Sequence, residues 1–456
     1  MSTVVAPREL DPPRDVGIPT PAPSAVPPRP RVRRRIRPVL FWMHLTLGSA
    51  LGLVILTQAL TGISIAYRRQ IVPAVIARQV AAPAPGAPRL SLDTLAARAA
   101  AASGGRSPSG ITLRRDAGAP VAMQFGRDRT VYLDPYTGRV LPGAPRLEAF
   151  FAYLEGVHRW LALTGTRSEF GEAVTSASVL AFFGLLLSGL YLWLPARWTR
   201  RNVRAVALVT RGARGRARDW NWHHVAGLWA SPLILVTTVT GLCMAYQWPT
   251  RLLARVTGSP SAQSGEPRAG GPPGGGPPGG SDAGARDAPG RDRSGPAGGG
   301  RPGARPASPR ASLDTLAARA LAASPASWYS LQLRLGGPGG PRGGPRGGPR
   351  GGPPGVSASI STTANLRPDL TTQLTLDPAT GAVQARPDDA GRDLAGRARG
   401  WMHPVHSGEG FGVLGETVAV GAALAAAVLV WTGLALALRR LRRRLARGGA
   451  SAAVAA

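Results

Sequence analysis

The segment Leu40–Tyr67 reads LFWMHLTLGSALGLVILTQALTGISIAY and decides the class of fold. It contains no charged side chain, and a helix needs roughly 20 apolar residues to cross a hydrocarbon layer about 30 Å thick. Three more segments have a similar length and apolar character: Ala173–Leu194, Val225–Tyr246 and Val413–Leu438. A soluble protein rarely buries four such helices, so we predict an α-helical membrane protein with four transmembrane helices.

The remaining composition excludes a compact soluble enzyme. Of the 456 residues, 60 are Gly and 44 are Pro, and they gather in tracts that cannot build a hydrophobic core. The single cysteine, Cys243, excludes an internal disulfide framework and any cysteine-based zinc or iron–sulfur site.

The distribution of arginine predicts the orientation in the membrane. All 55 basic residues are Arg, and against 24 acidic residues they give a net charge of +31. Three clusters flank the apolar segments, at residues 31–37, 197–218 and 439–447. Arginine in short flanks stays on the cytoplasmic side, so we expect both termini to be cytoplasmic and residues 68–172 and 247–412 to lie outside. Topology then explains the charge without a nucleic-acid partner.

Short motifs of the first half recur in the same order in the second half. The run SLDTLAARA occupies Ser91–Ala99 and again Ser312–Ala320. The pattern LDPxTG occupies Leu133–Gly138 and again Leu376–Gly381. We therefore predict two tandem repeats of helix, outer domain and helix, separated and interrupted by tracts rich in Gly, Pro and Arg.

Each outer domain is predicted to be a small α+β unit. Ser91 and Ser312 can cap a helix that carries Asp93 or Asp314 in its first turn. Runs rich in β-branched residues follow each helix, at 111–115, 121–125 and 130–133 in the first copy and at 328–335, 356–363 and 373–376 in the second. The sequence Asp-Pro-x-Thr-Gly is a turn signature. Neither domain contains His or Cys, so we expect both to bind or shield and assign no catalytic side chain.

The predicted organisation combines these elements along the chain. It comprises a disordered basic cytoplasmic N-terminus (1–37), a first transmembrane helix (38–67), a first outer domain (68–145), an outer helix with the second transmembrane helix (146–195), a basic cytoplasmic loop (196–221), a third transmembrane helix (222–248), a low-complexity linker (249–310), a second outer domain (311–390) with an insertion (336–355), an outer helix with the fourth transmembrane helix (398–438), and a basic cytoplasmic tail (439–456).

The six histidines lie only at the ends of the predicted spans. They are His44, His158, His223, His224, His403 and His406. His44 and His223 occupy equivalent positions in the two halves, at the cytoplasmic side, and each is followed four residues later by Gly. The other side carries His158, His403 and His406. The pattern predicts two groups of imidazoles, one at each membrane face.

Two imidazoles from neighbouring helices can hold a haem iron without an open coordination site, which suits electron transfer. We pair His44 with His223 and His158 with His406, and expect two haem b groups. The repeat spacing does not choose between His403 and His406, and His224 has no counterpart in the first half. A zinc or copper site on His403-x-x-His406 and simple interfacial anchoring by each imidazole are the alternatives.

Two further features accompany the spans. Glu172 and Glu416 begin the second and fourth spans, where a carboxylate favours a helix N-terminus, and a proton or substrate role is the alternative. Small dipeptides stand near the helix ends at Thr61-Gly62, Ser188-Gly189, Thr240-Gly241 and Thr432-Gly433. Such residues predict close contacts between helices.

The motifs in this order resemble the PepSY-associated transmembrane family, also described as iron-regulated or PiuB-like membrane proteins. The matching pieces are Phe41-Trp-Met-His44-x-x-x-Gly48, Leu133-Asp-Pro-Tyr-Thr-Gly138, Val157-His158-Arg159-Trp160, Trp222-His223-x-x-x-Gly227 and Val405-His406-Ser-Gly408. The resemblance covers roughly residues 38–255 and 311–440. The two Gly/Pro/Arg insertions and the Pro-rich N-terminus depart from the family pattern.

The resemblance implies a multi-pass protein of the bacterial cytoplasmic (inner) membrane with two PepSY-like domains outside it. Some members of the family look like haem-bearing reductases that release iron from ferric siderophores. The helix-end histidines of that family correspond to His44, His158, His223 and His406 of this chain.

These observations lead to two functional hypotheses. In the first, a cytoplasmic or quinol electron donor reduces the inner haem, and the outer haem passes electrons to a ferric siderophore or another iron chelate during iron uptake. A donor is needed because no Rossmann glycine pattern or flavin motif is present. In the second, the protein is non-enzymatic, and its PepSY-like domains bind or regulate a partner such as a peptidase.

Overall fold

The computed structural model describes residues 31–82, 84, 86–126, 129–194, 199–259, 311–324, 327–335, 355–386 and 393–455. It contains four helical segments long and apolar enough to cross a membrane: Ile36–Ala77, Arg167–Trp193, Gly215–Ala245 and Glu409–Ala446. The prediction of four transmembrane helices is confirmed. The N-terminus and most of the two predicted low-complexity tracts lie outside the described residues.

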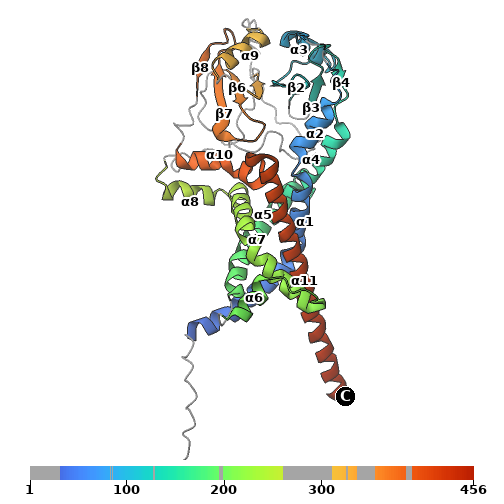
Figure 1. The fold of residues 1–456 in the computed structure, drawn as a ribbon, viewed down its shortest axis with the longest axis vertical. Coiled ribbons are helices and arrows are strands. Elements are labelled where there is room, and N and C mark those ends of the chain that lie inside the picture. Colours follow the sequence, from blue (N-terminus) through green and yellow to red (C-terminus); the bar gives the residue numbers. More distant parts are fainter. Residues whose placement is uncertain are drawn as a thin grey trace, which may run out of the picture.

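The four long helices form a bundle (Figure 1). They are α1 (Arg31–Ile65), α5 (Arg167–Trp193), α7 (Gly215–Ala245) and α11 (Gly412–Ala455). Helix α1 contacts α5 and α11, and α7 contacts the same two helices, so each helix has two neighbours around the bundle. Small side chains of α11, Ala422 and Ala426, lie in one buried cluster with Ile234 of the adjacent helix α7 and Leu186 of α5, which allows the helices to approach closely.

Short helices surround the two ends of this bundle. At the end that we call the sheet end lie α2 (Arg68–Ala77), α4 (Pro145–Trp160), α8 (Trp248–Val256), α10 (Leu394–Ser407) and the 3₁₀ turn η4 (Glu409–Phe411). At the opposite end, which we call the basic end, lies α6 (Arg200–Ala207) between α5 and α7.

Above the bundle at the sheet end, eight strands form one antiparallel sheet. The strands are β1 (Gly110–Arg114), β2 (Val121–Phe125), β3 (Arg129–Leu133), β4 (Val140–Leu141), β5 (Ser330–Arg334), β6 (Val356–Ser361), β7 (Thr371–Leu376) and β8 (Val383–Ala385). Their order is β4-β3-β2-β1-β5-β6-β7-β8. Strands β1 and β5 pair antiparallel with Ile111 opposite Leu333, so the two predicted outer domains share a single sheet.

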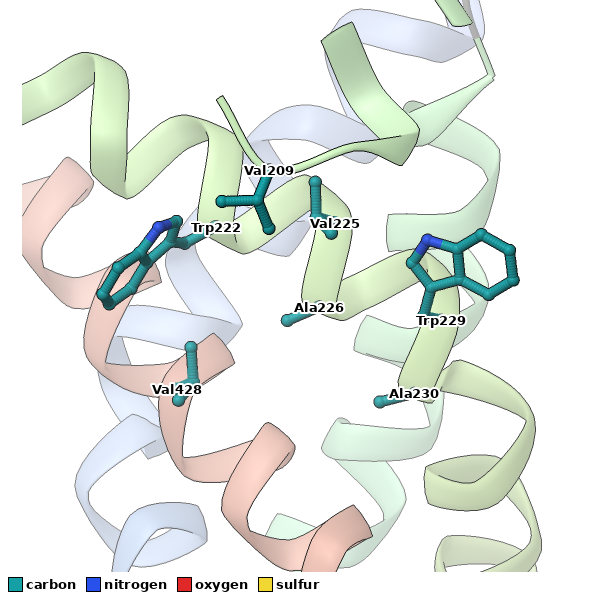
Figure 2. A pocket seen from close by; sticks show the side chains of 7 residues that line it. All are labelled: Val209, Trp222, Val225, Ala226, Trp229, Ala230 and Val428. Carbon is teal, nitrogen blue, oxygen red and sulfur yellow. The ribbon is translucent and has the colours of Figure 1, made fainter. Parts of the chain in front are cut away.

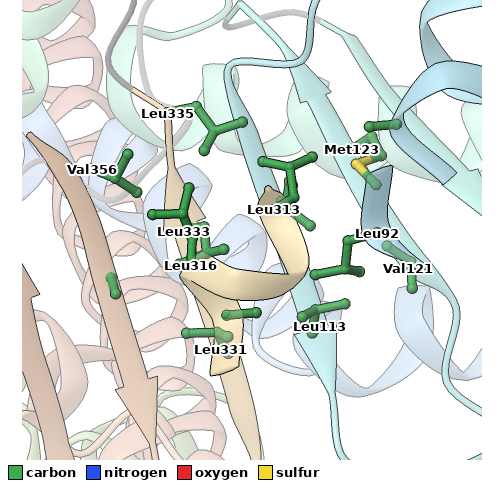
Figure 3. Packing of buried hydrophobic residues seen from close by; sticks show 14 of the residues in the cluster. Leu92, Leu113, Val121, Met123, Leu313, Leu316, Leu331, Leu333, Leu335 and Val356 are labelled. Atoms are coloured by element: carbon green, nitrogen blue, oxygen red, sulfur yellow. The ribbon is translucent and has the colours of Figure 1, made fainter. Parts of the chain in front are cut away.

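Helices α3 (Leu92–Ala101) and α9 (Leu313–Ala322) cover one face of this sheet. Leu92 and Leu313 pack in one apolar cluster with Leu113 and Leu331 from the two central strands (Figure 3). The core therefore runs without a break across the junction between the domains. Burial of this shared apolar surface opposes their separation.

The N-termini of α3 and α9 cap one another. Ser91 and Ser312 each accept a hydrogen bond within their own helix, from the backbone N–H of Thr94 and Thr315, as predicted. Asp93, however, accepts from the backbone N–H of Leu313 with both oxygens at 3.1 Å, across the junction. Asp314 in return accepts from Leu92 at 2.9 Å. Each carboxylate therefore satisfies the first free N–H of the opposite helix.

Several predicted boundaries are wrong because ordered helices continue into segments assigned to loops. Helix α1 begins at Arg31 inside the predicted disordered segment 1–37, and α7 begins at Gly215 inside the predicted loop 196–221. Helix α8 occupies part of the predicted linker 249–310, and α11 continues to Ala455 through the predicted tail. Arginine is a good helix former, so charge marks the membrane boundary without ending a helix.

The strands are confirmed to within one or two residues, with one omission in each half. The short edge strands β4 and β8 were not predicted, because two or three residues carry no readable alternation. The predicted Asp-Pro-x-Thr-Gly turn precedes each of them. Asp134 Oδ1 accepts from Tyr136 and Thr137 backbone N–H groups, and Gly138 has a φ of 65° that favours glycine.

Reciprocal capping predicts an effect that crosses from one helix to the other. Replacing Asp93 by Ala should cost about 1 kcal/mol of stability, the usual cost of a lost N-cap acceptor. Hydrogen exchange should report the loss at the backbone amide of Leu313 in α9. Asp93→Asn retains an acceptor oxygen and should preserve most of the protection, whereas equal exchange in wild type and Asp93→Ala would contradict the contact.

Candidate functional site

The structure brings four of the six histidines together as two facing pairs. The first pair is His44 of α1 and His223 of α7, with ring centroids 6.3 Å apart at an interplanar angle of 87°. The second pair is His158 of α4 and His406 of α10, with centroids 6.5 Å apart at 62°. These are the pairings that the sequence suggested.

The two pairs lie near opposite ends of the bundle. Helix α1 contacts both pairs: it carries His44 of the first pair, and its Gly62 contacts His158 of the second pair. Eighteen residues of α-helix rise about 27 Å, which is close to the ~30 Å thickness of a hydrocarbon layer. The first pair therefore belongs to the basic end and the second pair to the sheet end.

Each paired imidazole is held by the hydroxyl group of a Ser or Thr on a neighbouring helix. The Nδ1 contacts are His44 to Ser188 at 3.0 Å, His158 to Thr61 at 3.0 Å, His223 to Thr432 at 3.0 Å and His406 to Thr240 at 3.3 Å. The same interaction thus recurs once for every paired histidine, and it links α1 to α5, α4 to α1, α7 to α11 and α10 to α7.

A glycine follows each of these hydroxyl residues and receives the edge of the imidazole. A Cβ placed on Gly189 would lie 3.2 Å from Cε1 of His44, and one on Gly241 would lie 3.2 Å from Cε1 of His406. The corresponding distances at Gly433 and Gly62 are 3.4 and 3.5 Å, to His223 and His158. A Cβ at Gly189 or Gly241 would press on the ring, and one at Gly433 or Gly62 would touch it, so each Ser/Thr-Gly dipeptide forms a close-fitting cradle for one histidine.

The cradle determines which ring nitrogen carries the proton. The Thr432 hydroxyl donates to the carbonyl of Val428 in its own helix at 2.7 Å, and the Thr61 hydroxyl donates to Thr57 in the same way at 2.7 Å. With its proton used, a hydroxyl can only accept from the imidazole. Backbone carbonyls of Leu429 and Thr237 also lie 3.1 and 2.9 Å from the Nδ1 atoms of the two histidines that they face, His223 and His406. Nδ1 is therefore the protonated nitrogen, and Nε2 keeps its lone pair.

At the sheet end, burial also keeps the imidazoles neutral. Desolvation, with a contribution from the neighbouring His406, lowers the pKa of His158 to about 4. Desolvation likewise lowers the pKa of His406. A neutral imidazole with a free Nε2 is the form that binds a metal ion.

The spacing within each pair fits one metal ion between two rings. An imidazole nitrogen lies about 2.0–2.1 Å from a bound metal ion, so two in-line rings have centroids roughly 6.3 Å apart. The observed values of 6.3 and 6.5 Å agree with this geometry. Two ligands leave four coordination positions to be filled by something other than this pair, and a planar tetradentate macrocycle such as haem meets that requirement.

The two remaining histidines lie outside the pairs. His224 donates from Nδ1 to the Trp220 carbonyl at 2.8 Å and stacks on the Trp220 ring at 4.0 Å. His403 lies 3.9 Å from a carboxylate oxygen of Glu409. Among the described residues, no three or more His, Cys, Asp or Glu side chains form a cluster that could hold a metal ion.

The cradle residues are the part of the site that sequence reasoning missed. Their four dipeptides were assigned to close helix contacts, although each span carries one of them and four histidines needed partners. Gly48 and Gly227, which follow His44 and His223 by four residues, do not belong to the cradles. A Cβ on either would face a leucine, Leu185 at 3.8 Å or Leu429 at 3.5 Å, so these glycines allow close helix packing.

An apolar pocket of about 360 Å³ flanks the first pair at the basic end (Figure 2). Trp222 and Trp229 of α7 stand on either side of Ala226 and Ala230, and Val428 of α11 lies across from them. The lining residues Trp222 and Val428 immediately precede His223 and its acceptor Leu429 in the sequence. The pocket thus borders the first cradle and offers only apolar side chains.

Ion pairs surround both ends of the bundle. At the basic end, Asp219 is buried and pairs with Arg218 at 2.9 Å and Arg439 at 2.8 Å, which ties α7 to α11. At the sheet end, Arg68 pairs with Glu155 at 2.8 Å, which fixes α2 against α4 beside the second pair.

Four membrane-spanning helices define a polytopic membrane protein, and a facing imidazole pair lies near each end of its bundle. The chain belongs to the PepSY-associated transmembrane family, because the sequence profile of the PepSY-associated TM region matches residues 41–440. The family resemblance seen in the sequence is confirmed. A search of curated proteins found no match to this chain.

The cradle geometry predicts an unusual tautomer that can be measured without any ligand. In ligand-free protein labelled with ¹⁵N-histidine, His44, His158, His223 and His406 should all carry the proton on Nδ1, as shown by the two ring-nitrogen chemical shifts. Single His→Gln variants assign the signals. A proton on Nε2 in any of the four would show that the hydroxyl is the donor and would contradict the proposed cradle.

Proposed function

We propose that this protein is a di-haem transmembrane electron-transfer protein that reduces a ferric chelate. The observation that carries this proposal is the pair of facing imidazoles at each end of the bundle. The Nε2 atom of each ring is free, and the distance between the two ring centroids is the one expected for two ligands of one metal ion. His44 and His223 would hold one haem b, and His158 and His406 the other. When bound, the two haems supply one-electron redox chemistry on either side of an insulating layer.

The residues of the chain contribute position and electronic tuning. The hydroxyl and carbonyl acceptors at Nδ1 orient each ring and raise the basicity of Nε2. The glycines leave room for the Cε1 edge of each imidazole against the neighbouring helix. With an imidazole from each of two helices as its protein ligands, a bound haem iron would have no open position, which would favour electron transfer over oxygen binding.

The direction of transfer follows from the arginine distribution. The family resemblance implies a bacterial cytoplasmic membrane, and we infer that the basic end faces the cytoplasm because the short arginine-rich flanks lie at that end. The sheet end then faces outward, and its PepSY-like domains stand where a ferric siderophore or another iron chelate would arrive. The apolar pocket beside His223 favours a lipid-soluble quinol as the electron donor, with a cytoplasmic redox protein as the other source.

We also propose that the two halves arose by duplication of a unit made of helix, PepSY-like domain and helix. The support is the correspondence of contacts. His44 meets Ser188-Gly189 of α5 as His223 meets Thr432-Gly433 of α11, and His158 meets Thr61-Gly62 of α1 as His406 meets Thr240-Gly241 of α7. The reciprocal caps of α3 and α9 obey the same relation.

Haem content after histidine replacement tests the function. Protein purified from haem-replete cells should carry about two haem groups per chain with the absorption spectrum of six-coordinate haem. His223→Ala or His406→Ala should each reduce the content to about one, and the double variant should carry none. His224→Ala and His403→Ala are the matched controls and should retain two. A wild-type protein without a Soret band would refute the proposal.

The cradle should also set the midpoint potential of its haem. Thr432→Val replaces the acceptor hydroxyl by a methyl group of equal size, lowers the basicity of His223 and destabilises ferric iron. The potential of one haem should rise by tens of millivolts, where about 59 mV corresponds to a tenfold change for one electron. Redox titration measures the shift. Thr46→Val, whose hydroxyl donates only to the Trp42 and Met43 carbonyls of its own helix, should leave both potentials unchanged.

A further inference from the structure

A buried carboxyl group near the start of α11 has no cationic partner among the described residues. Glu416 is 1 % exposed. Its Oε1 atom accepts a hydrogen bond from Nε2 of Gln70 in α2 at 2.7 Å. Its Oε2 atom is buried with no hydrogen-bond partner in the part of the chain that the structure describes, and the same holds for Oε1 of Gln70. Two acceptor oxygens of adjacent side chains are therefore unsatisfied at one place.

The charged neighbours of Glu416 do not neutralise it. Arg69 of α2 is close enough to act on Glu416 electrostatically, but it pairs with Glu409 of η4 at 3.3 Å. Glu409 also has His403 of α10 beside it at 3.9 Å, and it adds a second negative charge near Glu416. An ionised carboxylate that is buried without a cation is costly. The start of α11 favours negative charge, but this effect is weaker than the loss of solvation.

We propose that Glu416 is a neutral carboxylic acid that forms a cyclic pair with the Gln70 amide and carries a proton at the sheet end of the bundle. In this pair the Glu416 O–H donates to Oε1 of Gln70, while Nε2 of Gln70 donates to Oε1 of Glu416. One added proton satisfies both of the unpartnered oxygens, which no change in the side-chain amide alone can do.

The site lies next to the second histidine pair. A Cβ on Gly408, two residues after His406, would collide with the backbone of Glu416. The backbone of Glu416 therefore packs against the turn that ends the histidine helix α10. The protonation of Glu416 does not depend on haem. A role for this proton in balancing charge during electron transfer, by contrast, rests on the proposed function.

Infrared spectroscopy tests the proposal on the full-length protein in lipid at pH 7. The difference spectrum of wild type minus Glu416→Gln should contain the C=O stretch of a protonated carboxyl group, which shifts in D₂O. Gln preserves the hydrogen bond to Gln70, so the variant should fold. Carboxylate bands without the C=O stretch would overturn the proposal. They would show that Glu416 is ionised and that a water molecule or a cation satisfies its Oε2 atom and Oε1 of Gln70.

Two further variants test whether the C=O stretch arises from the Glu416–Gln70 pair. Gln70→Leu removes both partners of the acid and should move the C=O stretch to higher frequency; an unchanged band would place the acid elsewhere and overturn the pair. Glu172→Gln is the matched control, since Glu172 follows Gly171 in α5 as Glu416 follows Gly415 in α11 but is half-exposed. Its difference spectrum should contain only carboxylate bands. Because these spectra need no haem, they can fail or succeed independently of the electron-transfer proposal.

Discussion

The arrangement of the whole bundle depends on one interaction, the hydrogen bond from an imidazole Nδ1 to a Ser or Thr hydroxyl with glycine as the next residue. It occurs at all four paired histidines and joins each histidine to a different helix. A hydroxyl that already donates to its own helix cannot donate to the ring, so the interaction fixes both the tautomer and the direction of Nε2. The free nitrogens are left for whatever lies between the two rings.

The sheet end needs additional support, because His158 and His406 stand on the short helices α4 and α10 and not on the spans themselves. The Arg68–Glu155 ion pair fixes α4 against α2, and the Leu366 backbone N–H donates to the Glu409 carbonyl beside α10. Above them, the pairing of β1 with β5 and the reciprocal caps of α3 and α9 join the two halves into one body. The two short helices are therefore connected through one continuous sheet and not through two separate domains.

The buried carboxyl groups at the two ends of the bundle have different partners. At the basic end, the buried Asp219 is neutralised by two arginines, so its charge serves to join α7 and α11. At the sheet end, Arg68 and Arg69 are already paired, and Glu416 is left with an amide as its only partner in the described chain. The difference follows from which arginines face each carboxylate: two arginines face Asp219, whereas Arg68 and Arg69 at the sheet end pair with Glu155 and Glu409.

The sequence by itself determined the four spans, most of the strands and the candidate histidines, because apolar length, alternation and residue type are properties of a few consecutive residues. Only the tertiary structure decided between His403 and His406. The turn after α4 is longer than the one after α10: Gly171 packs on the Trp160 carbonyl, whereas Gly415 packs on the Gly408 carbonyl, so spacing along the chain could not align His158 with its counterpart. The sequence likewise could not predict the cross-capping by Asp93 and Asp314, the histidine cradles, or the burial of Glu416 without a cation. Each depends on groups about a hundred or more residues apart, and only the packing of the folded chain brings such groups together.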